Sequence, residues 1–445
     1  MIKHKRLRIA VMIAVALAAS GCSLFKRGKA ASTPVLGKRI AVLTTEGDVQ
    51  VDLATAAMPM SLPQATVNDA WTQSGGNASK SMGQLALGNS LAQSWVVQAG
   101  RGSSLTARLA APPIAANGRV YTIDTLGAVR AFDASSGRML WASQTPFEER
   151  SNTPSLYGGG IAYDNGTIYA TNGLGWVAAL NESNGGISWK VRPGGPLRGA
   201  PTLGNNAIYV MSQDNQLYSL SEQDGSTNWS QAAALEIAGL FGSASPAVGQ
   251  GTVVAGFSSG ELNAYRYENG RAVWGDMLAR TGISTSVSTL SDIDAEPVID
   301  EGKVYAVGQG GRMAALDITT GQRLWELNIA GVASPAVAGE WVFVVTDQAK
   351  LLCIARSSGK VRWISELPRW RNEKKEEKPI MWVGPVVAGD RLILASSDGR
   401  LANISPSDGH LLSVVDLNTP MFLSPAVANN TLYTLDDKGH LTAWR

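Results

Sequence analysis

Short apolar runs rich in β-branched residues alternate with polar turns along most of the chain, and eight of them begin a similar unit. Proline leads the opening in seven copies, and proline is tolerated at the first residue of a strand. The openings stand at 111–114, 159–161, 200–203, 245–248, 296–299, 334–337, 384–387 and 424–427. A unit that recurs every 38 to 51 residues predicts an array, because one unit is too small to bury its own apolar faces.

Each unit has room for four strands. The opening is followed by a β-branched and aromatic run such as 120–123, and then by a third run that ends at Ala131-Phe132-Asp133. A turn built on Asp or Asn and Gly leads into the fourth strand, which carries a Trp four residues after the Gly. The pairs are Gly137/Trp141, Gly185/Trp189, Gly225/Trp229, Gly270/Trp274, Gly321/Trp325 and Gly359/Trp363.

The last two units depart from this pattern. The seventh keeps Gly409 but has Ser413 in place of Trp, and the eighth ends at Trp444-Arg445 without a fourth strand. An unpaired sheet edge is an aggregation hazard, so we expect a segment near the N-terminus to complete the last sheet. The segment 68–71 is the predicted donor, with Trp71 at the missing Trp position, while Trp95 begins the final strand before the first full unit.

The sequence therefore predicts an all-β fold, an eight-bladed β-propeller of four-stranded antiparallel blades over residues 67–445, closed by N- and C-terminal strands. The composition agrees, since 44% hydrophobic residues, 17% charged residues and 48 Gly describe a turn-rich globule. Long helices are not required anywhere in the ring.

The N-terminus has the pattern of a secretory signal, in which basic residues precede an apolar run at 9–19. The run is too short to span a membrane comfortably. Residues 19–22 resemble a bacterial lipoprotein processing site, which implies a signal peptide at 1–21 and lipidation of Cys22. Ser23 then implies sorting to the outer membrane, and residues 22–66 are expected to be the lipidated Cys and an N-terminal tether or extension, part of which could pack on the ring. The alternative is an ordinary signal peptide with an incidental Cys.

Loss of the signal also changes the charge. The four basic residues before the apolar run leave with it, so 34 of the 38 basic residues remain against 36 acidic ones, a net charge of −2. A nearly neutral surface argues against nucleic acid as a partner, because binding to phosphates requires a basic footprint.

Side chains suited to catalysis are few. Cys353 stands at a strand position that faces a blade core, and no second Cys remains for a disulfide within the mature ring. His410 and His440 follow turn glycines and are interpreted as exposed turn residues. No phosphate-binding loop or nucleophile elbow is present. The charged run 372–378 is typical of a solvated loop or short helix, with a partner contact as the alternative. The sequence favours a binding module without cofactor or metal.

The repeated Ala-x-Asp-x-x-x-Gly-x-x-x-Trp phrase resembles the blade motif of quinoprotein dehydrogenases, which hold pyrroloquinoline quinone and calcium on the propeller axis. A quinone-dependent enzyme is therefore an alternative. Those enzymes also carry a vicinal Cys-Cys disulfide, and this chain has no adjacent Cys pair. A lipoprotein that binds glycans or peptidoglycan is the third alternative.

A lipid-anchored propeller with this repeat is similar to the BamB family, the propeller lipoproteins of the outer-membrane β-barrel assembly (BAM) machinery. Two segments between units strengthen the resemblance, Leu197-Arg198-Gly199 and the stretch 290–297 with its Leu-Ser-Asp-x-Asp pattern. The resemblance implies a non-catalytic scaffold on the periplasmic face of the outer membrane, where these two loops bind a POTRA domain of BamA. It also implies help with the assembly of barrel precursors. The implied contact residues are Leu197, Arg198, Asp292 and Asp294.

Overall fold

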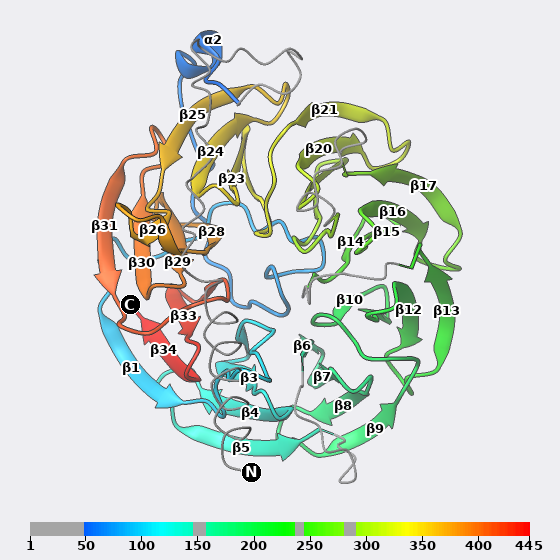
Figure 1. The fold of residues 1–445 in the computed structure, drawn as a ribbon. Helices are drawn as coiled ribbons and strands as arrows, with labels where there is room; N and C mark the ends of the chain where they lie inside the picture. The colour runs from blue at the N-terminus through cyan, green and yellow to red at the C-terminus, as the bar shows by residue number, and fades with distance from the viewer. Residues whose placement is uncertain (1–48, 146–156, 236–243, 280–290) are drawn as a thin grey trace, which may run out of the picture. The chain divides into compact units, whose positions relative to one another are not determined.

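The computed structural model describes residues 49–145, 157–235, 244–279 and 291–445. In these residues eight four-stranded antiparallel sheets stand side by side around a ring (Figure 1). The predicted eight-bladed β-propeller is therefore confirmed. Each of the eight predicted openings leads into the innermost strand of one blade or, in blade 7, lies within it.

The first four blades each follow the chain from the innermost to the outermost strand. Blade 1 is β2 (Ile114–Ala116), β3 (Arg119–Ile123), β4 (Ala128–Asp133) and β5 (Met139–Gln144). Blade 2 is β6 (Gly159–Asp164), β7 (Thr167–Asn172), β8 (Val177–Asn181) and β9 (Ile187–Val191). Blade 3 is β10 (Thr202–Gly204), β11 (Ala207–Met211), β12 (Gln216–Ser221) and β13 (Thr227–Ala232). Blade 4 is β14 (Ala247–Gly249), β15 (Thr252–Gly256), β16 (Glu261–Arg266) and β17 (Ala272–Met277).

The last four blades contain one insertion and the closure of the ring. Blade 5 is β18 (Val298–Asp300), β19 (Lys303–Gly308), β20 (Arg312–Asp317) and β21 (Arg323–Leu327). Blade 6 is β22 (Ala336–Ala338), β23 (Trp341–Val345), β24 (Lys350–Ala355) and β25 (Val361–Glu366). Blade 7 is β28 (Trp382–Ala388), β29 (Arg391–Ser396), β30 (Arg400–Ile404) and β31 (Leu411–Asp416), after a hairpin of β26 (Trp370–Asn372) and β27 (Glu377–Pro379). Blade 8 is β32 (Ala426–Ala428), β33 (Thr431–Leu435), β34 (His440–Trp444) and β1 (Gln93–Gln98).

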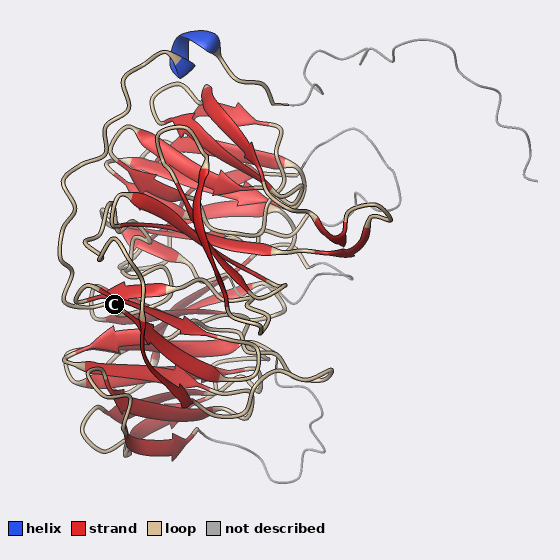
Figure 2. Ribbon diagram, turned by 90° about the vertical axis from the view of Figure 1, so that its left-hand side faces the viewer, coloured by secondary structure: helices blue, strands red, loops and turns tan. Residues whose placement is uncertain are grey.

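Burial falls from the centre of the ring to its rim. In blade 1 all three residues of β2 are buried, whereas most residues of β5 are exposed or half-buried. The strands run between the two flat faces of the disc (Figure 2). Because neighbouring strands are antiparallel, the turns between strands two and three lie on the same face as the blade-to-blade connections. We call this side the connection face; its described connections are 99–113, 192–201, 291–297, 328–335, 367–381 and 417–425.

The turn glycine and the Trp of the repeat join neighbouring blades. Trp325 of blade 5 donates its indole N–H to the carbonyl oxygen of Arg356 in blade 6 at 2.9 Å, and its ring lies against Gly359. The same contact recurs at six other joints, through the Trp residues 95, 141, 189, 229, 274 and 363. The Gly adopts a positive φ and leaves no space for a Cβ, so each blade needs a Gly at the turn that receives the Trp of the preceding blade.

The last blade is completed by β1, and the prediction that residues 68–71 would do so is wrong. β1 pairs with β34, so that Gln93 lies opposite Trp444, and Trp95 occupies the Trp position. Trp71 instead forms a bridge to Ala115 on the innermost strand of blade 1. Trp95 is followed by two valines that suit a strand, whereas Trp71 is followed within five residues by Gly75 and Gly76.

Residues 66–87, here called the channel segment, cross the middle of the ring (blue in Figure 1). The segment bonds to the innermost strands or their turns in seven of the eight blades. Its backbone hydrogen-bond partners are Ala115, Tyr163, Val248, Ile299, Val387 and Asn429, and the Gln73 side chain adds Leu203. The centre of the propeller is therefore filled largely by its own chain.

Residues 49–65 lie along blade 6. Val51 forms a parallel bridge to Val361 of β25, and a short helix, α2 (Leu53–Ala56), follows the N-cap Asp52. Met60 and Leu62 pack against the apolar cores of blades 6 and 7. Across the described ranges no helix has the length and apolar character needed to cross a bilayer.

Candidate partner-binding site

The connection between blades 2 and 3 carries the first predicted pair, Leu197 and Arg198. Leu197 forms an isolated antiparallel bridge to Ser212, and its side chain is fully buried in the core between the two blades. The backbone N–H of Arg198 donates to the carbonyl oxygen of Met211 at 2.8 Å. These bonds fix the loop to the end of β11 and the turn that follows it in blade 3, so the ring sets the position of the loop.

The connection between blades 4 and 5 carries the two predicted carboxylates. Ile293 donates its backbone N–H to Phe257 O at 3.1 Å, and Gln309 donates its backbone N–H to Asp292 O at 2.9 Å. Asp292 is fully buried, and Asp294 is nearly so. This loop is therefore fastened to blade 4 on one side and to blade 5 on the other.

Arg198 and Asp294 connect the two loops. Arg198 Nη2 lies 3.0 Å from Asp294 Oδ1, and the two side chains are only 3% and 9% exposed. The Gln309 side chain donates to the other carboxylate oxygen. Burial raises the pKa of Asp294 to about 6, an effect that the Asp292 charge reinforces and that the Arg198 guanidinium only partly offsets. The pair is a buried brace between the connection of blades 2 and 3 and the connection of blades 4 and 5, which lie two joints apart in the ring.

The structure thus brings together the two loops that the sequence singled out, but it buries the four side chains. A direct contact between a partner and the Arg198 guanidinium would require the brace to open. Among the described residues around the brace, Pro196 is exposed, as are Gln213 and Asp214 on the neighbouring turn of blade 3. Gln213 is held there by a backbone bond to Pro196 O at 2.8 Å. Partner binding by these loops remains a prediction, with the four residues as its supporting core.

A second buried ion pair, which the sequence reading missed, lies next to the brace. Lys80 of the channel segment donates to Ser74 O at 2.8 Å and to Thr202 Oγ1 at 3.1 Å, and its Nζ lies 3.9 Å from Glu296 Oε1. Burial lowers the pKa of Lys80, and the Glu296 charge partly offsets this effect. The sequence did mark one member of this pair, because Glu296 precedes the proline of its opening, where three other copies have Ser.

A cavity of about 160 Å³ lies above the channel segment at the centre of the ring. Its lining includes Trp71, Lys80, Asp294, Glu296 and Phe422. This volume is below the 300–1,000 Å³ typical of sites for drug-sized ligands. Among the described residues no group of three His, Cys, Asp or Glu side chains could hold a metal ion. These residues do not fit a quinone with calcium on the axis.

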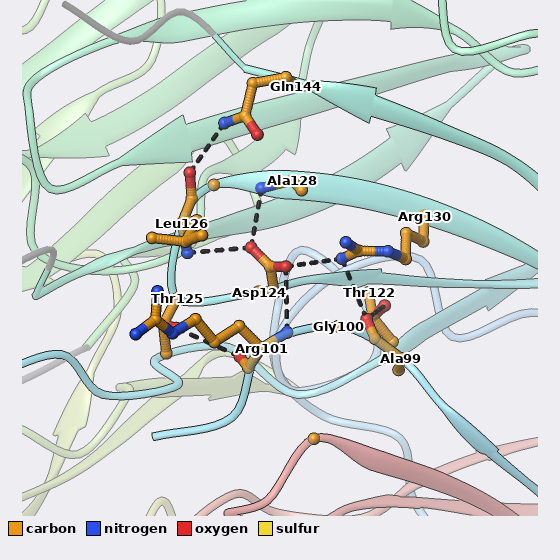
Figure 3. A network of polar contacts seen from close by, with 12 residues as sticks. Ala99, Gly100, Arg101, Thr122, Asp124, Thr125, Leu126, Ala128, Arg130 and Gln144 are labelled. Atoms are coloured by element: carbon orange, nitrogen blue, oxygen red, sulfur yellow. Dashed lines mark hydrogen bonds and ion pairs between the residues drawn. The ribbon is translucent and has the colours of Figure 1, made fainter. Parts of the chain in front are cut away.

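A further polar cluster on the connection face is structural (Figure 3). Asp124 accepts from the backbone N–H groups of Arg101, Leu126 and Ala128 and forms an ion pair with Arg130 at 2.7 Å. A Cβ on Gly100 would lie 2.3 Å from the Arg130 guanidinium. The Asp124 carboxylate therefore holds the connection between blades 8 and 1 against the β3–β4 turn of blade 1.

The remaining predicted positions have simple environments. Cys353 is a free, fully buried thiol whose pKa burial raises above the ordinary value, so its predicted position in a blade core is confirmed. His410 is exposed, while His440 begins β34 half-buried, and each ring bonds to an Asp of its own turn. The charged run 372–378 belongs to the exposed β26–β27 hairpin instead of a plain loop or helix. Cys22 lies outside the described residues.

Residues 126–365, more than half of the chain, match the family described as outer membrane protein assembly factor BamB. The chain belongs to the BamB family. Among curated relatives, the outer membrane protein assembly factor BamB of Yersinia pestis is 27% identical over 319 residues, which cover 70% of this chain and 78% of that protein. Family membership confirms the resemblance drawn from the loops and the repeat.

Solved structures share the fold. BamB from Moraxella catarrhalis superposes with a TM-score of 0.61 at 17% identity, over 80% of this chain and 98% of that one. A quinohemoprotein alcohol dehydrogenase from Comamonas testosteroni gives 0.63 at 14% identity, over 85% and 81%. At these identities the likeness shows the propeller alone, so it does not distinguish a BamB-like scaffold from an enzyme. The family match and the filled channel favour the BamB family.

Proposed function

We propose that this chain is a non-catalytic scaffold lipoprotein of the outer-membrane β-barrel assembly machinery. In this proposal residues 1–21 are a signal peptide, and Cys22, at the start of the N-terminal extension 22–66, carries the lipid that holds the protein on the periplasmic face of the outer membrane. The ring binds a POTRA domain of BamA and assists the assembly and insertion of barrel proteins. Membership of the BamB family and the name of the curated relatives support it.

The observation that carries the proposal is the brace between the two loops. Arg198 and Asp294 stand 96 residues apart in the chain and meet at 3.0 Å on the connection face. A buried ion pair contributes little net stability, because desolvation of both charges offsets most of their attraction. Such a pair does fix the relative position of two loops, and a preorganised surface loses less entropy when it binds.

The brace suggests how the site works. The four buried residues hold the loops, and the exposed residues around them, Pro196, Gln213 and Asp214, make the contact. A rigid surface of this kind suits recognition of a folded domain, and a POTRA domain is folded. Chemistry on a small substrate has less support, because the central cavity is small and the channel segment crosses the middle of the ring.

The test is co-purification with BamA of the wild type and of Arg198→Ala, Asp292→Ala and Asp294→Ala. We expect Arg198→Ala to reduce recovery severalfold, because it leaves the Asp294 carboxylate buried without its cation. Arg356→Ala is the matched control. Arg356 is also buried and paired with carboxylates, Asp300 and Glu301, but on the opposite face of the ring.

The outcomes separate function from site. If the wild type does not recover BamA, the proposed function is wrong. If the loop variants recover it fully, or if Arg356→Ala loses it equally, the assignment of the site is wrong. A titration with pyrroloquinoline quinone and calcium addresses the enzyme alternative, and saturable binding on the ring would revive it.

A further inference from the structure

The joint between blades 7 and 8 differs from the seven others. At each of those, a Trp covers the turn of the next blade, but blade 7 has Ser413 at this position. In blade 8 no turn joins the third and outermost strands, because β34 and β1 come from opposite ends of the chain. Polar bonds replace the Trp, since Asn403 donates to Ser413 Oγ and Arg391 donates to Asn403 and to Gly88 O.

As a result, β31 is the most apolar exposed edge on the rim. Leu411, Leu412 and Val414 are 56%, 49% and 41% exposed. No other outermost strand exposes more than one large apolar side chain among the described residues; these are Val96, Met139, Ile187, Met277 and Leu324. Within the same residues, the backbone of β31 bonds only to β30, so its outer edge is unpaired.

A recess of about 270 Å³ lies beside this edge. Its apolar wall is formed by Met60, Leu62 and Leu412, and the rest of its lining is Asp390 and the β30–β31 turn at 405–407. For comparison, a cavity of about 150 Å³ is large enough to hold benzene. An aromatic or large aliphatic side chain therefore fits the recess, which places a side-chain pocket next to an open strand edge.

We propose that β31 and the recess bind an extended chain segment in which apolar and polar residues alternate, as in the strands of an unfolded outer-membrane barrel. This proposal rests on the proposed function and names a substrate contact for it. The segment adds to blade 7 as a fifth strand, its backbone satisfies the free groups of β31, and one apolar side chain enters the recess. Strand addition of this kind combines main-chain affinity with side-chain selection.

The size of the edge favours this occupant over a second copy of the chain. β31 has six residues, roughly 20 Å of strand at about 3.3 Å per residue. A stable dimer takes roughly 20–30 residues a side, so pairing of two β31 edges is too small to hold. A transmembrane barrel strand has about 9–11 residues with alternating apolar side chains, which matches one edge and one recess.

The experiment measures binding of a fluorescent, uncharged ten-residue peptide that alternates apolar residues, one of them Phe, with Ser and Thr. We expect saturable binding to the full chain and a loss of roughly tenfold or more in the double variant Leu412→Lys/Val414→Lys, since lysines block strand addition at native edges. Leu324→Lys is the matched control, because Leu324 on β21 is exposed to a similar degree, and it should bind as the wild type does. A peptide of the same composition with its apolar residues clustered should bind more weakly.

Several results would overturn the proposal: no binding by the wild type, equal binding by the double variant, or equal binding of the clustered peptide. A dimer in sedimentation that the double variant dissociates would assign the edge to a second copy. Co-purification with BamA is measured on the same variants. We expect the double variant to retain it, so failure of the edge and failure of the scaffold function remain distinguishable.

Discussion

Gly359 offers a direct test of how the blades are joined. It adopts a φ of +71°, and a Cβ added there would lie 2.7 Å from Cγ and Cδ2 of Trp325. The Trp325 ring cannot move away freely, because it is 8% exposed and its indole N–H bonds to Arg356 O at 2.9 Å. Gly359→Ala therefore introduces two separate penalties, one in the backbone and one in packing.

Gly302 separates the two penalties. It has a similar φ of +78°, but a Cβ there would have no atom within 4 Å. An L-residue in this conformation costs about 1–2 kcal/mol, and overpacking of a filled site costs about 1–3 kcal/mol more. We expect Gly302→Ala to lower the free energy of unfolding by about 1–2 kcal/mol and Gly359→Ala by about 2–5 kcal/mol.

The assay is urea unfolding followed by tryptophan fluorescence, with the shift in midpoint compared at constant slope. Trp325→Ala, alone and combined with Gly359→Ala, completes a double-mutant cycle in which the packing penalty should disappear once the ring is removed. Equal losses for Gly302→Ala and Gly359→Ala, or additivity in the cycle, would refute the idea that the Trp contact requires this glycine.

Three further predictions concern buried groups. Cys353 should not react with a thiol reagent in the native protein and should react stoichiometrically in urea; native labelling would contradict its burial. Lys80→Met should cost about 3–5 kcal/mol in urea unfolding, because Glu296 keeps a buried charge, and Lys80→Met/Glu296→Gln should recover most of the loss unless the two groups are uncoupled. Because the Asp294 pKa is raised from 3.8 to about 6, its protonated form is favoured in the folded state, so stability should fall by at most about 3 kcal/mol as the pH rises from roughly 4 to 6. Asp294→Asn should remove this slope, and an unchanged slope would refute its origin.

The blades were predictable from the sequence because their determinants are local. Each copy needs a Gly with positive φ that receives the Trp of the preceding blade, and most copies supply a Trp that covers the Gly of the next blade, so the pattern recurs in the sequence. The closing strand was harder to assign. Both Trp71 and Trp95 precede the first full unit, and only the β-branched residues after Trp95 show which of them can sustain a strand.

The loops were found by their resemblance, but their burial could not be foreseen. Arg198 and Asp294 meet only because a ring places connections from different blades near one axis. The channel segment has no repeat pattern of its own, so nothing in its sequence announces that Lys80 is enclosed beside Glu296. The closed ring buries these two ion pairs, and no single segment does so by itself.

The pairing of β1 with β34 also sets an order for folding. Gln93 is made long before its partner Trp444, and the channel segment likewise precedes the inner strands that it bonds. Contacts between the two ends of a chain close the longest loop available and form slowly. Until the last strand has been made, the chain is an open row of blades in which β1 has no partner strand. Closure is therefore the step at which the protein most needs protection from aggregation.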